Sequence, residues 1–337
     1  MSNINKLPSE IEQELVHRTK ARTNPEYGCE PEERPMREYI EMGVVNLDKT
    51  RGPTSHEVVA WVKSILEIKK AGHAGSLDPK VTGVLPIMLG RATKAVSALR
   101  LAGKEYVCLM RLHNLVPEDE IIRVCNEFKG PIFQMPPIKS AVKRAIRIRN
   151  IYYLEVLEVK GPLVLMRVGC EAGTYIRKLC HDIGEILGCG AHMQELRRTK
   201  TGPFTEDTVV TLHDLEDAYV FWKENGSESE LRRVIRPMEE GLRHLPRIII
   251  RDSAVDAICC GAMLAVPGIV SLDSNINKGE IICLFTQKGE AVALCKAVMG
   301  TDEILQAESG IAAVTERVIM DAGTYPKGWI NRPEVPR

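Results

Sequence analysis

The sequence predicts an α+β domain followed by a small β-barrel. Residues 43–236 alternate strand-like apolar runs with segments of helical periodicity. From residue 247 onward the apolar runs become short and are separated by Gly, Pro and Asn, as in a small barrel. A chain of 337 residues has room for two or three domains and a large core.

The N-terminal residues are polar and broken by proline. Residues 1–35 contain Asn24-Pro25, Pro31 and Pro35, so we expect an irregular arm with one short helix near residues 8–18. The first domain then begins with the apolar run Gly43 to Leu47.

A helix is predicted after this run. Thr54 and Glu57 have the spacing of a capping box, which marks a helix start. The apolar residues that follow fall on one helical face: Val58, Trp61, Val62, Ile65 and Leu66.

Strand and helix signals continue to residue 236. Strands are predicted at 84–89 and 105–112, and two more at 151–159 and 163–170 form a hairpin around Gly161-Pro162. Helices are predicted over Thr174 to Leu187, ended by Gly188, and over a charged stretch at about 214–236.

The last part of the chain is a series of β-like runs. They cover 247–250, 264–272, 280–285, 290–299 and 314–320. Their periodicity alone is equally compatible with a generic barrel of unrelated role, because one fold hosts many functions.

Composition excludes little. Basic and acidic residues number 45 each, yet a neutral total does not exclude nucleic acid, because binding depends on where the basic residues lie. Ten cysteines without a CxxC pair are expected to be free thiols in a reducing cytosol. We therefore expect no metal site.

Motif searches give further expectations. His56-Glu57 begins like a zincin HExxH helix, but position 60 is Ala. Without a GxGxxG or GxxxxGK loop we expect no cofactor, and without a signal peptide or an apolar run of about 18 residues we expect a cytoplasmic protein.

The segment GHAGSLDP at residues 72–79 places one acid, Asp78, in a loop of small residues. Gly72 and Gly75 permit a tight turn and leave room for a bulky substrate. Taken alone, the segment is most simply a solvated turn.

Three other blocks stand around this segment: residues 43–66, KEYVCLMRL at 104–112, and CEAGTYIRKLCHDIG at 170–184. In this order the four resemble the TruB type of pseudouridine synthase, over about residues 34–329. Within that group the chain is most similar to dyskerin and its archaeal counterparts, the catalytic subunit of the H/ACA guide-RNA particle. The stretch IIIRDSAVDAICCGAMLAVPGI resembles the start of a PUA domain.

The resemblance implies a catalytic acid. Converting uridine to pseudouridine requires a carboxylate beside the anomeric carbon, acting as nucleophile or base. The resemblance gives this role to Asp78 and pairs it with Arg177, whose charged fork would keep the carboxylate ionised. It does not distinguish attack on the sugar, attack on the base and proton transfer.

The resemblance also implies a pocket for a flipped-out base. Tyr106 would lie against the base, with Tyr175 as a second aromatic and Leu196 as an apolar wall. His73 would lie near the flipped nucleotide. Without the family, Tyr106 and Leu196 would be assigned to the core and His73 to a structural role.

Lys49 matches a family lysine that supports the active-site loop or the substrate. The chain departs from the family next to it, because Thr50-Arg51 replaces a proline-containing run. Ser76 stands where threonine is more common. Asp78 is untouched by both changes.

Two basic stretches are predicted to contact RNA phosphates, although such charge runs are more often solvated surface. Gln134, Pro136 and Pro137 match the family just before the first stretch. The basic residues are Lys139, Lys143, Arg144, Arg147 and Arg149 in the first stretch and Arg197, Arg198 and Lys200 in the second.

The resemblance predicts an N-terminal arm at 1–38, partly packed on the PUA domain, a catalytic domain with a mixed sheet and a central cleft at 39–245, and a PUA barrel at 246–330. The expected partners are an H/ACA guide RNA, an rRNA or tRNA substrate and small particle proteins, with no membrane. The sequence lacks a long lysine-rich tail, like the archaeal form; a eukaryotic protein of this kind would be nuclear or nucleolar.

Three alternatives remain open. A stand-alone tRNA pseudouridine synthase is the nearest. A PUA-bearing tRNA base-exchange enzyme would need a zinc site, and an RNA scaffold without activity would not need Asp78, Tyr106 and Arg177 together.

Overall fold

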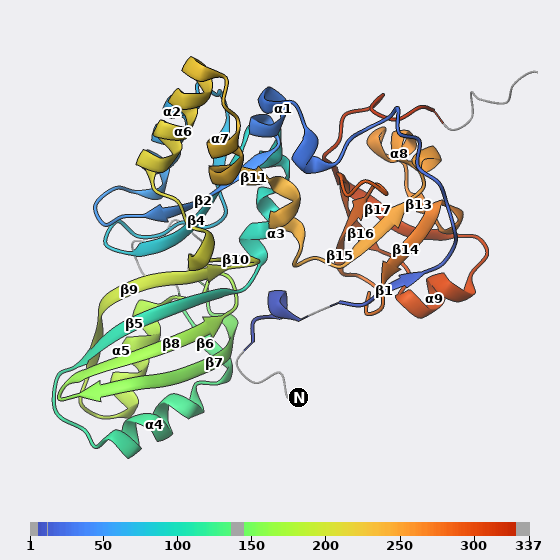
Figure 1. The fold of residues 1–337 in the computed structure, drawn as a ribbon. Coiled ribbons are helices and arrows are strands. Elements are labelled where there is room, and N and C mark those ends of the chain that lie inside the picture. The colour runs from blue at the N-terminus through green and yellow to red at the C-terminus, as the bar shows by residue number, and fades with distance from the viewer. Residues whose placement is uncertain (1–5, 12, 136–144, 328–337) are drawn as a thin grey trace, which may run out of the picture. The chain divides into compact units, whose positions relative to one another are not determined.

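A computed structural model describes residues 6–11, 13–135 and 145–327 (Figure 1). The chain forms two compact units that interleave along the sequence. The first takes residues 1–11, 45–87 and 99–234, and the second takes 12–44, 88–98 and 235–337. The predicted domains follow the chain continuously, whereas these units are built from separated segments.

The larger sheet has the strand order β11-β2-β4-β9-β5-β8-β7-β6, with β3 paired to β4 and β10 to β9. It is mixed, because β4 pairs with β9 in parallel while β5, β8 and β7 are antiparallel neighbours. Its strands are β2 (Gly43–Lys49), β3 (Ala71–His73), β4 (Thr82–Leu89), β5 (Lys104–Leu112), β6 (Gly130–Gln134), β7 (Arg147–Lys160), β8 (Leu163–Cys170), β9 (Ala191–Thr201), β10 (Phe204–Thr205) and β11 (Arg236–Pro237).

Helix boundaries follow local signals. Thr54 caps α2 and forms the predicted box with Glu57, and Gly188, at φ 67°, follows the end of α5. The α-helices are α1 (Met36–Glu41), α2 (Ser55–Ile65), α3 (Val96–Leu101), α4 (Glu118–Glu127), α5 (Ile176–Ile186), α6 (Leu212–Asn225), α7 (Ser229–Val234), α8 (Asp252–Cys259) and α9 (Thr301–Gln306). The 3₁₀ turns are η1 (Pro8–Glu10), η2 (Pro31–Glu33), η3 (Gly90–Ala95), η4 (Glu206–Thr208), η5 (Met238–Leu242) and η6 (Val266–Gly268).

The core of the first unit lies between the strands β5, β7 and β8 and the helices α4 and α5, which cover one face of the sheet (Figure 1). Met110, Val164 and Leu179 are fully buried in it. Tyr106 and Leu196 pack at its border and are only partly buried. This packing fixes α5, which carries Arg177, against the sheet.

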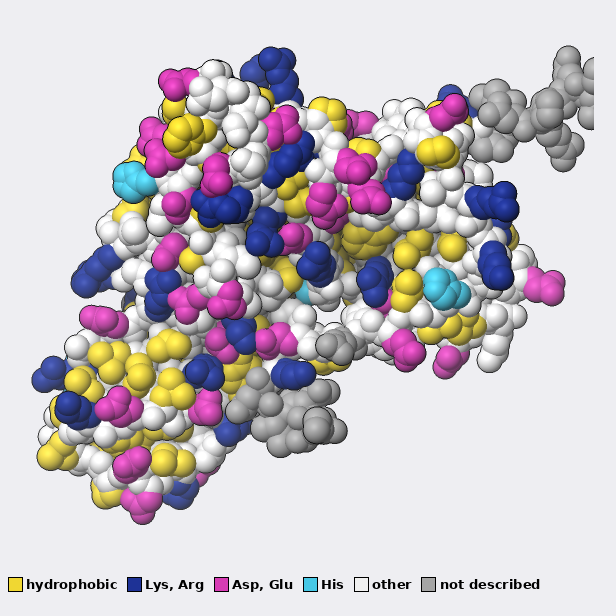
Figure 2. All heavy atoms as spheres, viewed as in Figure 1, with side chains coloured by type: hydrophobic (Ala, Val, Ile, Leu, Met, Phe, Trp, Pro, Cys, Tyr) yellow, Lys and Arg dark blue, Asp and Glu magenta, His cyan; other side chains and the backbone are white. Residues whose placement is uncertain are grey.

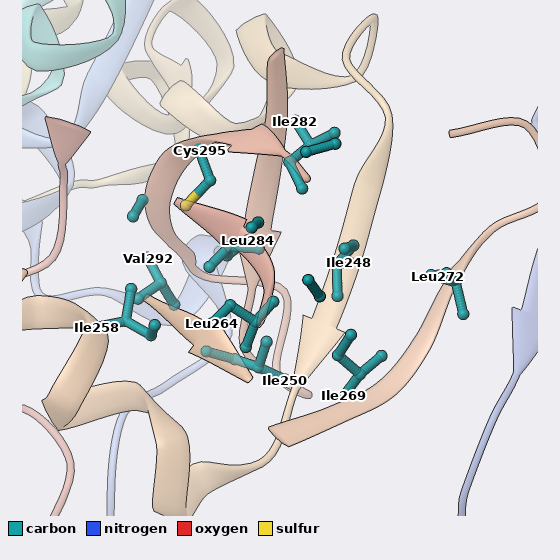
Figure 3. Packing of buried hydrophobic residues seen from close by; sticks show 14 of the residues in the cluster. Ile248, Ile250, Ile258, Leu264, Ile269, Leu272, Ile282, Leu284, Val292 and Cys295 are labelled. Carbon is teal, nitrogen blue, oxygen red and sulfur yellow. The ribbon is translucent and has the colours of Figure 1, made fainter. Parts of the chain in front are cut away.

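The second unit contains the smaller sheet, in the order β1-β14-β12-β15-β16-β17-β13. Register shifts in several pairings help it curl around a core in which Ile248, Ile282 and Leu284 are fully buried (Figure 3). Its strands are β1 (Leu15–His17), β12 (Arg247–Ile250), β13 (Leu264–Ala265), β14 (Ile269–Asp273), β15 (Ile281–Phe285), β16 (Ala291–Ala297) and β17 (Ile311–Val318).

Three element predictions are wrong in detail. The helix expected near residues 8–18 is absent from the described part of this segment, which instead contains η1 and the strand β1. The single run at 264–272 is divided by η6, which contains Pro267. The helical stretch at 214–236 is two helices, because Gly226 adopts φ 69° and ends α6.

Within the ranges that the structure describes, the longest helix is α6 with 14 residues, and none has the length and apolar character needed to cross a membrane.

Candidate functional site

Asp78 lies in the loop between β3 and β4, opposite the first turn of α5. Arg177, the second residue of that helix, donates from Nη2 to Asp78 Oδ2. The side chain of Arg177 is 59% exposed and that of Asp78 is 57% exposed, so the ion pair is open to a large substrate. The structure thus brings together the predicted acid and its predicted cation, which are 99 residues apart in the chain.

Lys49 lies beneath this loop at the end of β2 and is 1% exposed. Its Nζ donates to the carbonyls of Thr50 and Val81 at 3.0 Å, and to those of Asp78 and Pro79 at 3.4 Å. Burial lowers the pKa of Lys49, while the charge of Asp78 acts to raise it. Lys49 therefore holds the main chain of the loop.

Ser55 is a second support that our sequence analysis missed. Its hydroxyl accepts from the amide of Leu77 at 2.9 Å and donates to the Leu77 carbonyl at 3.2 Å. Gly52 adds a hydrogen bond from its amide to the Pro79 carbonyl at 2.9 Å. A buried serine in the first turn of a helix follows an ordinary pattern, so only its position after the capping threonine could have drawn attention to it.

Tyr106 and Leu196 belong to the neighbouring strands β5 and β9 and border the core beneath α5. Burial raises the pKa of the Tyr106 phenol, so the hydroxyl is neutral and can donate or accept. The residue opposite Tyr106 in the register is Arg198. Both predicted pocket residues therefore lie on the face of the sheet that α5 covers.

Tyr175 is the N-cap of α5, and its main chain is held by Gln134 at the end of β6. The Gln134 side chain accepts from the Tyr175 amide at 2.9 Å and donates to its carbonyl at 3.2 Å. Gln134 is 2% exposed. It therefore fixes the start of the helix that carries Arg177.

His73 ends β3, and its Nδ1 accepts from the amide of Gly75 at 3.3 Å. Its ring lies edge-on to that of His56, with centroids 5.1 Å apart. Burial lowers the pKa of His73, and the nearby His56 and Arg198 lower it further. The ring is therefore neutral at pH 7, and the acceptor at Nδ1 leaves the proton on Nε2.

The basic side chains of the second stretch, Arg197, Arg198 and Lys200, mostly bind partners within the protein. Arg197 forms a two-pronged pair with Asp48 at 3.0 and 3.1 Å and also contacts Glu206. Lys200 pairs with Glu10 at 2.6 Å. Contact of Arg197 and Lys200 with RNA phosphates therefore stays a prediction.

Arg198 does not fit direct RNA contact, because it is only 1% exposed. Its Nε donates to the Val84 carbonyl at 2.7 Å and its Nη2 to the Gly75 carbonyl at 3.1 Å. We correct the prediction for this residue: its guanidinium is directed into the protein, where a phosphate cannot reach it.

The first basic stretch is described only in part. Lys139, Lys143 and Arg144 lie outside the described residues. Arg147 opens β7 opposite Gln134, and Arg149 pairs with Glu171 at 3.1 Å. On the face of the molecule drawn in Figure 2, Lys and Arg side chains are interspersed with Asp and Glu.

This arrangement has a defined chemical capacity. An ionised carboxylate held on a rigid loop can attack an electrophilic carbon or accept a proton from a substrate. The guanidinium beside it pairs with that carboxylate and can hold its orientation. Among the described residues, no three His, Cys, Asp or Glu side chains are grouped so that they could bind a metal.

Comparison with known families covers most of the chain. The TruB family pseudouridylate synthase N-terminal domain matches residues 63–176, and the tRNA pseudouridylate synthase B C-terminal domain matches 177–243. The DKCLD (NUC011) domain matches residues 5–59 and the PUA domain matches 246–319.

Curated relatives and solved structures agree with these matches. The chain is 70% identical over 334 residues to a probable tRNA pseudouridine synthase B of Methanosarcina acetivorans, covering 99% of each chain. It is 59% identical over 317 residues to the protein of that name in Methanocaldococcus jannaschii, covering 94% of each.

Among solved structures, a Cbf5 chain in a Cbf5-Nop10-Gar1 complex matches with a TM-score of 0.92 and 56% identity, over 96% of this chain and 98% of that one. A chain of an H/ACA RNP bound to a substrate RNA that contains 2′-deoxyuridine matches with a TM-score of 0.90 and 54% identity, over 96% and 100%. The chain therefore belongs to the TruB family of pseudouridylate synthases and is an RNA pseudouridine synthase.

Proposed function

We propose that this enzyme is the catalytic subunit of an H/ACA particle and isomerises uridines that a guide RNA selects. The observation that carries the proposal is the likeness to Cbf5 in complex with Nop10 and Gar1, at a TM-score of 0.92 over 96% of the chain. Its partners would be an H/ACA guide RNA and small proteins of the Nop10 and Gar1 kind.

In this proposal Asp78 is the catalytic residue, acting on the uridine as nucleophile or base. Arg177 holds the orientation of the carboxylate, which is supported by their ion pair. Tyr106 lies against the flipped-out base, with Tyr175 and Leu196 completing the pocket and His73 near the nucleotide. Lys49 supports the loop from inside.

The proposed substrates are rRNA uridines, with a tRNA arm as a second class. A guide paired to its target presents an RNA duplex, which a protein recognises by shape and backbone. The PUA-matching residues 246–319 would anchor this RNA, and the basic residues of the first stretch would follow its phosphates. A small misplacement of the target uridine at Asp78 would reduce the rate strongly.

A stand-alone tRNA pseudouridine synthase is the second candidate. The names of the Methanosarcina and Methanocaldococcus relatives favour it, because both are called tRNA pseudouridine synthase B. The two candidates differ in whether guide and partners are needed for a given target.

The experiment adds components in turn to the purified chain. One rRNA fragment and one tRNA are incubated with the enzyme alone, then with small particle proteins, then with a guide RNA, and pseudouridine is mapped. We expect modification of the rRNA fragment to require the guide and to move when the guide sequence is changed. Equal modification at every stage would favour the stand-alone tRNA enzyme.

Asp78→Asn is the control for the chemistry. An amide preserves the shape of the side chain but supplies neither nucleophile nor base. We expect a folded variant that binds RNA and forms no product. Product from this variant would exclude Asp78 as the catalytic residue.

A further inference from the structure

Arg198 is a buried cation with an unusual set of partners. It is among the largest of the fully buried side chains, at 1% exposure. Within the described ranges, no carboxylate forms an ion pair with its guanidinium. Burial lowers the pKa of Arg198, and the nearby Tyr106 hydroxyl acts in the opposite direction.

The contacts of this guanidinium lead to three parts of the site. Nε donates to the Val84 carbonyl in β4 at 2.7 Å, which ties the group to the sheet. Nη2 donates to the Gly75 carbonyl at 3.1 Å, three residues before Asp78. The third part is Tyr106, which stands opposite Arg198 in the register between β5 and β9.

A buried charge without an ionic partner is costly, and an apolar side chain of similar volume would be cheaper to bury. Stability alone therefore does not explain an arginine here. What the planar fork provides is several N–H groups with fixed mutual directions, so that one rigid group can orient a loop and a phenol together. A lysine could satisfy one or two of these acceptors, but not with the same geometry.

We propose that Arg198 is a positioning residue of the reaction. It orients the ring of Tyr106 through the hydroxyl and holds the start of the Asp78 loop through Gly75, without touching the RNA. The inference rests on the roles proposed above for Asp78 and Tyr106. It replaces the expectation that this arginine binds a phosphate.

The test is a double-mutant cycle between Arg198→Met and Tyr106→Phe, with Arg198→Lys as the conservative variant. For each protein, the single-turnover rate at saturating RNA and the Kd for the RNA are measured in the assembled particle. We expect Arg198→Met to lower the rate by about 100-fold, because the Asp78 loop and Tyr106 are no longer held in place. The Kd should change by less than about twofold, because Arg198 does not contact the RNA. Arg198→Lys should recover only part of the rate.

The cycle identifies the route of the effect. If Arg198 acts through the Tyr106 hydroxyl, Tyr106→Phe should lower the rate in the native background and have little further effect beside Arg198→Met. If the two substitutions instead lower the rate by independent factors that multiply, Arg198 does not act through the Tyr106 hydroxyl. A weaker Kd with a reduced salt dependence and an unchanged saturated rate would restore the phosphate contact.

Two controls separate folding and chemistry. Leu231→Ala removes core volume in α7, which belongs to neither the loop nor α5, so it lowers Tm without touching these contacts, and its rate should stay close to that of the native enzyme. If Arg198→Met does not fold, the cycle is run with Arg198→Lys. An active Asp78→Asn would overturn the catalytic role proposed for Asp78, whereas an inactive Asp78→Asn beside a fully active Arg198→Met would overturn only the present inference.

Discussion

The side-chain amide of Gln134 is paired with the main chain of Tyr175 through two hydrogen bonds, of 2.9 and 3.2 Å. The two residues are 41 positions apart, and Gln134 is 2% exposed. Because Arg177 is two residues beyond Tyr175, this contact joins the end of β6 to the helix turn that holds the Asp78 carboxylate.

Gln134→Ala should therefore weaken catalysis without touching the reacting groups. Loss of the side-chain amide removes both hydrogen bonds at a cost of about 1 to 3 kcal/mol in stability, mainly at the Tyr175 N–H, since the Tyr175 carbonyl still accepts from the amides of Lys178 and Leu179. We expect a lower Tm and a single-turnover rate reduced by about tenfold, since the first turn of α5 becomes less fixed. Gln134→Glu keeps the acceptor and loses the donor, so an effect as large as that of alanine would contradict a role for both bonds.

Arg177→Lys should impair the enzyme severely although the charge is kept. The guanidinium contacts Asp78 as part of a rigid planar fork, whereas an ammonium is a flexible point charge. We expect a single-turnover rate reduced by about 100-fold or more. The Tm should hardly change, because exposed ion pairs contribute little to stability. A near-native rate would leave Arg177 with a structural role only.

Lys49→Met should loosen the catalytic loop from inside. The ammonium donates to four carbonyls, two of them at 3.0 Å, and methionine removes all four bonds. The carbonyls of Asp78 and Pro79 keep the amides of Val81 and Gly52 as donors, so the loss falls mainly on those of Thr50 and Val81. We expect a loss of at least about 2 kcal/mol in unfolding free energy and a reduced rate at saturating RNA. Lys80→Met is the matched control, because Lys80 is an exposed lysine of the same loop. Equal losses for the two variants would contradict the support assigned to Lys49.

Gly83→Ala tests the close approach of β4 and β9. Gly83 has φ +105°, and a Cβ there would lie 2.1 Å from the carbonyl oxygen of Arg198, its partner in the parallel register. A main-chain atom cannot move aside cheaply, so we expect a loss of about 3 kcal/mol or more, measured by denaturant unfolding. Gly188→Ala has a similar positive φ but nothing within 4 Å, and should cost about 1 kcal/mol.

The buried Lys104 predicts a pH dependence of stability. Burial, and after it the charge of Arg198, lower the pKa of Lys104 to about 7 from its ordinary value of 10.5. Between these two values the unfolded chain binds more protons than the folded one, so stability from this group rises with pH across that window.

Measured as the difference between the native enzyme and Lys104→Met, the rise should approach about 1.4 kcal/mol per pH unit between pH 7 and 10 and flatten below the window. Urea unfolding at a series of pH values gives this difference. A flat difference would mean that the ammonium remains charged through its bonds to the carbonyls of Leu99, Arg100 and Ala102.

Local signals predicted much of the fold. The capping box of Thr54 and Glu57 and the hairpin around Gly161-Pro162 were confirmed, because turns and caps depend on residues close in sequence. The arm was predicted wrongly at residues 8–18. Its strand β1 exists because it pairs with β14, about which the arm's own sequence contains no information.

The candidate site was predictable where a motif is local. The family resemblance named Asp78 and Arg177, and the structure brings them into contact. Ser55 was missed, and Arg198 was given to the surface because a run of charges indicates nothing about burial. Adjacent strand residues point to opposite faces, so Arg197 pairs with Asp48 while Arg198 is directed into the protein.

Strand β1 has a consequence for how the polypeptide matures on the ribosome. Leu15 pairs with Asp273, so β1, which is among the first parts to be made, has no partner strand until more than 270 residues have been synthesised. A contact of such separation forms late, because closing the intervening loop is entropically unfavourable. Until then a row of main-chain donors and acceptors on β14 is open to other chains. The short N-terminal strand therefore covers the edge of β14 only after this long loop has closed, and from then on protects that edge against self-association.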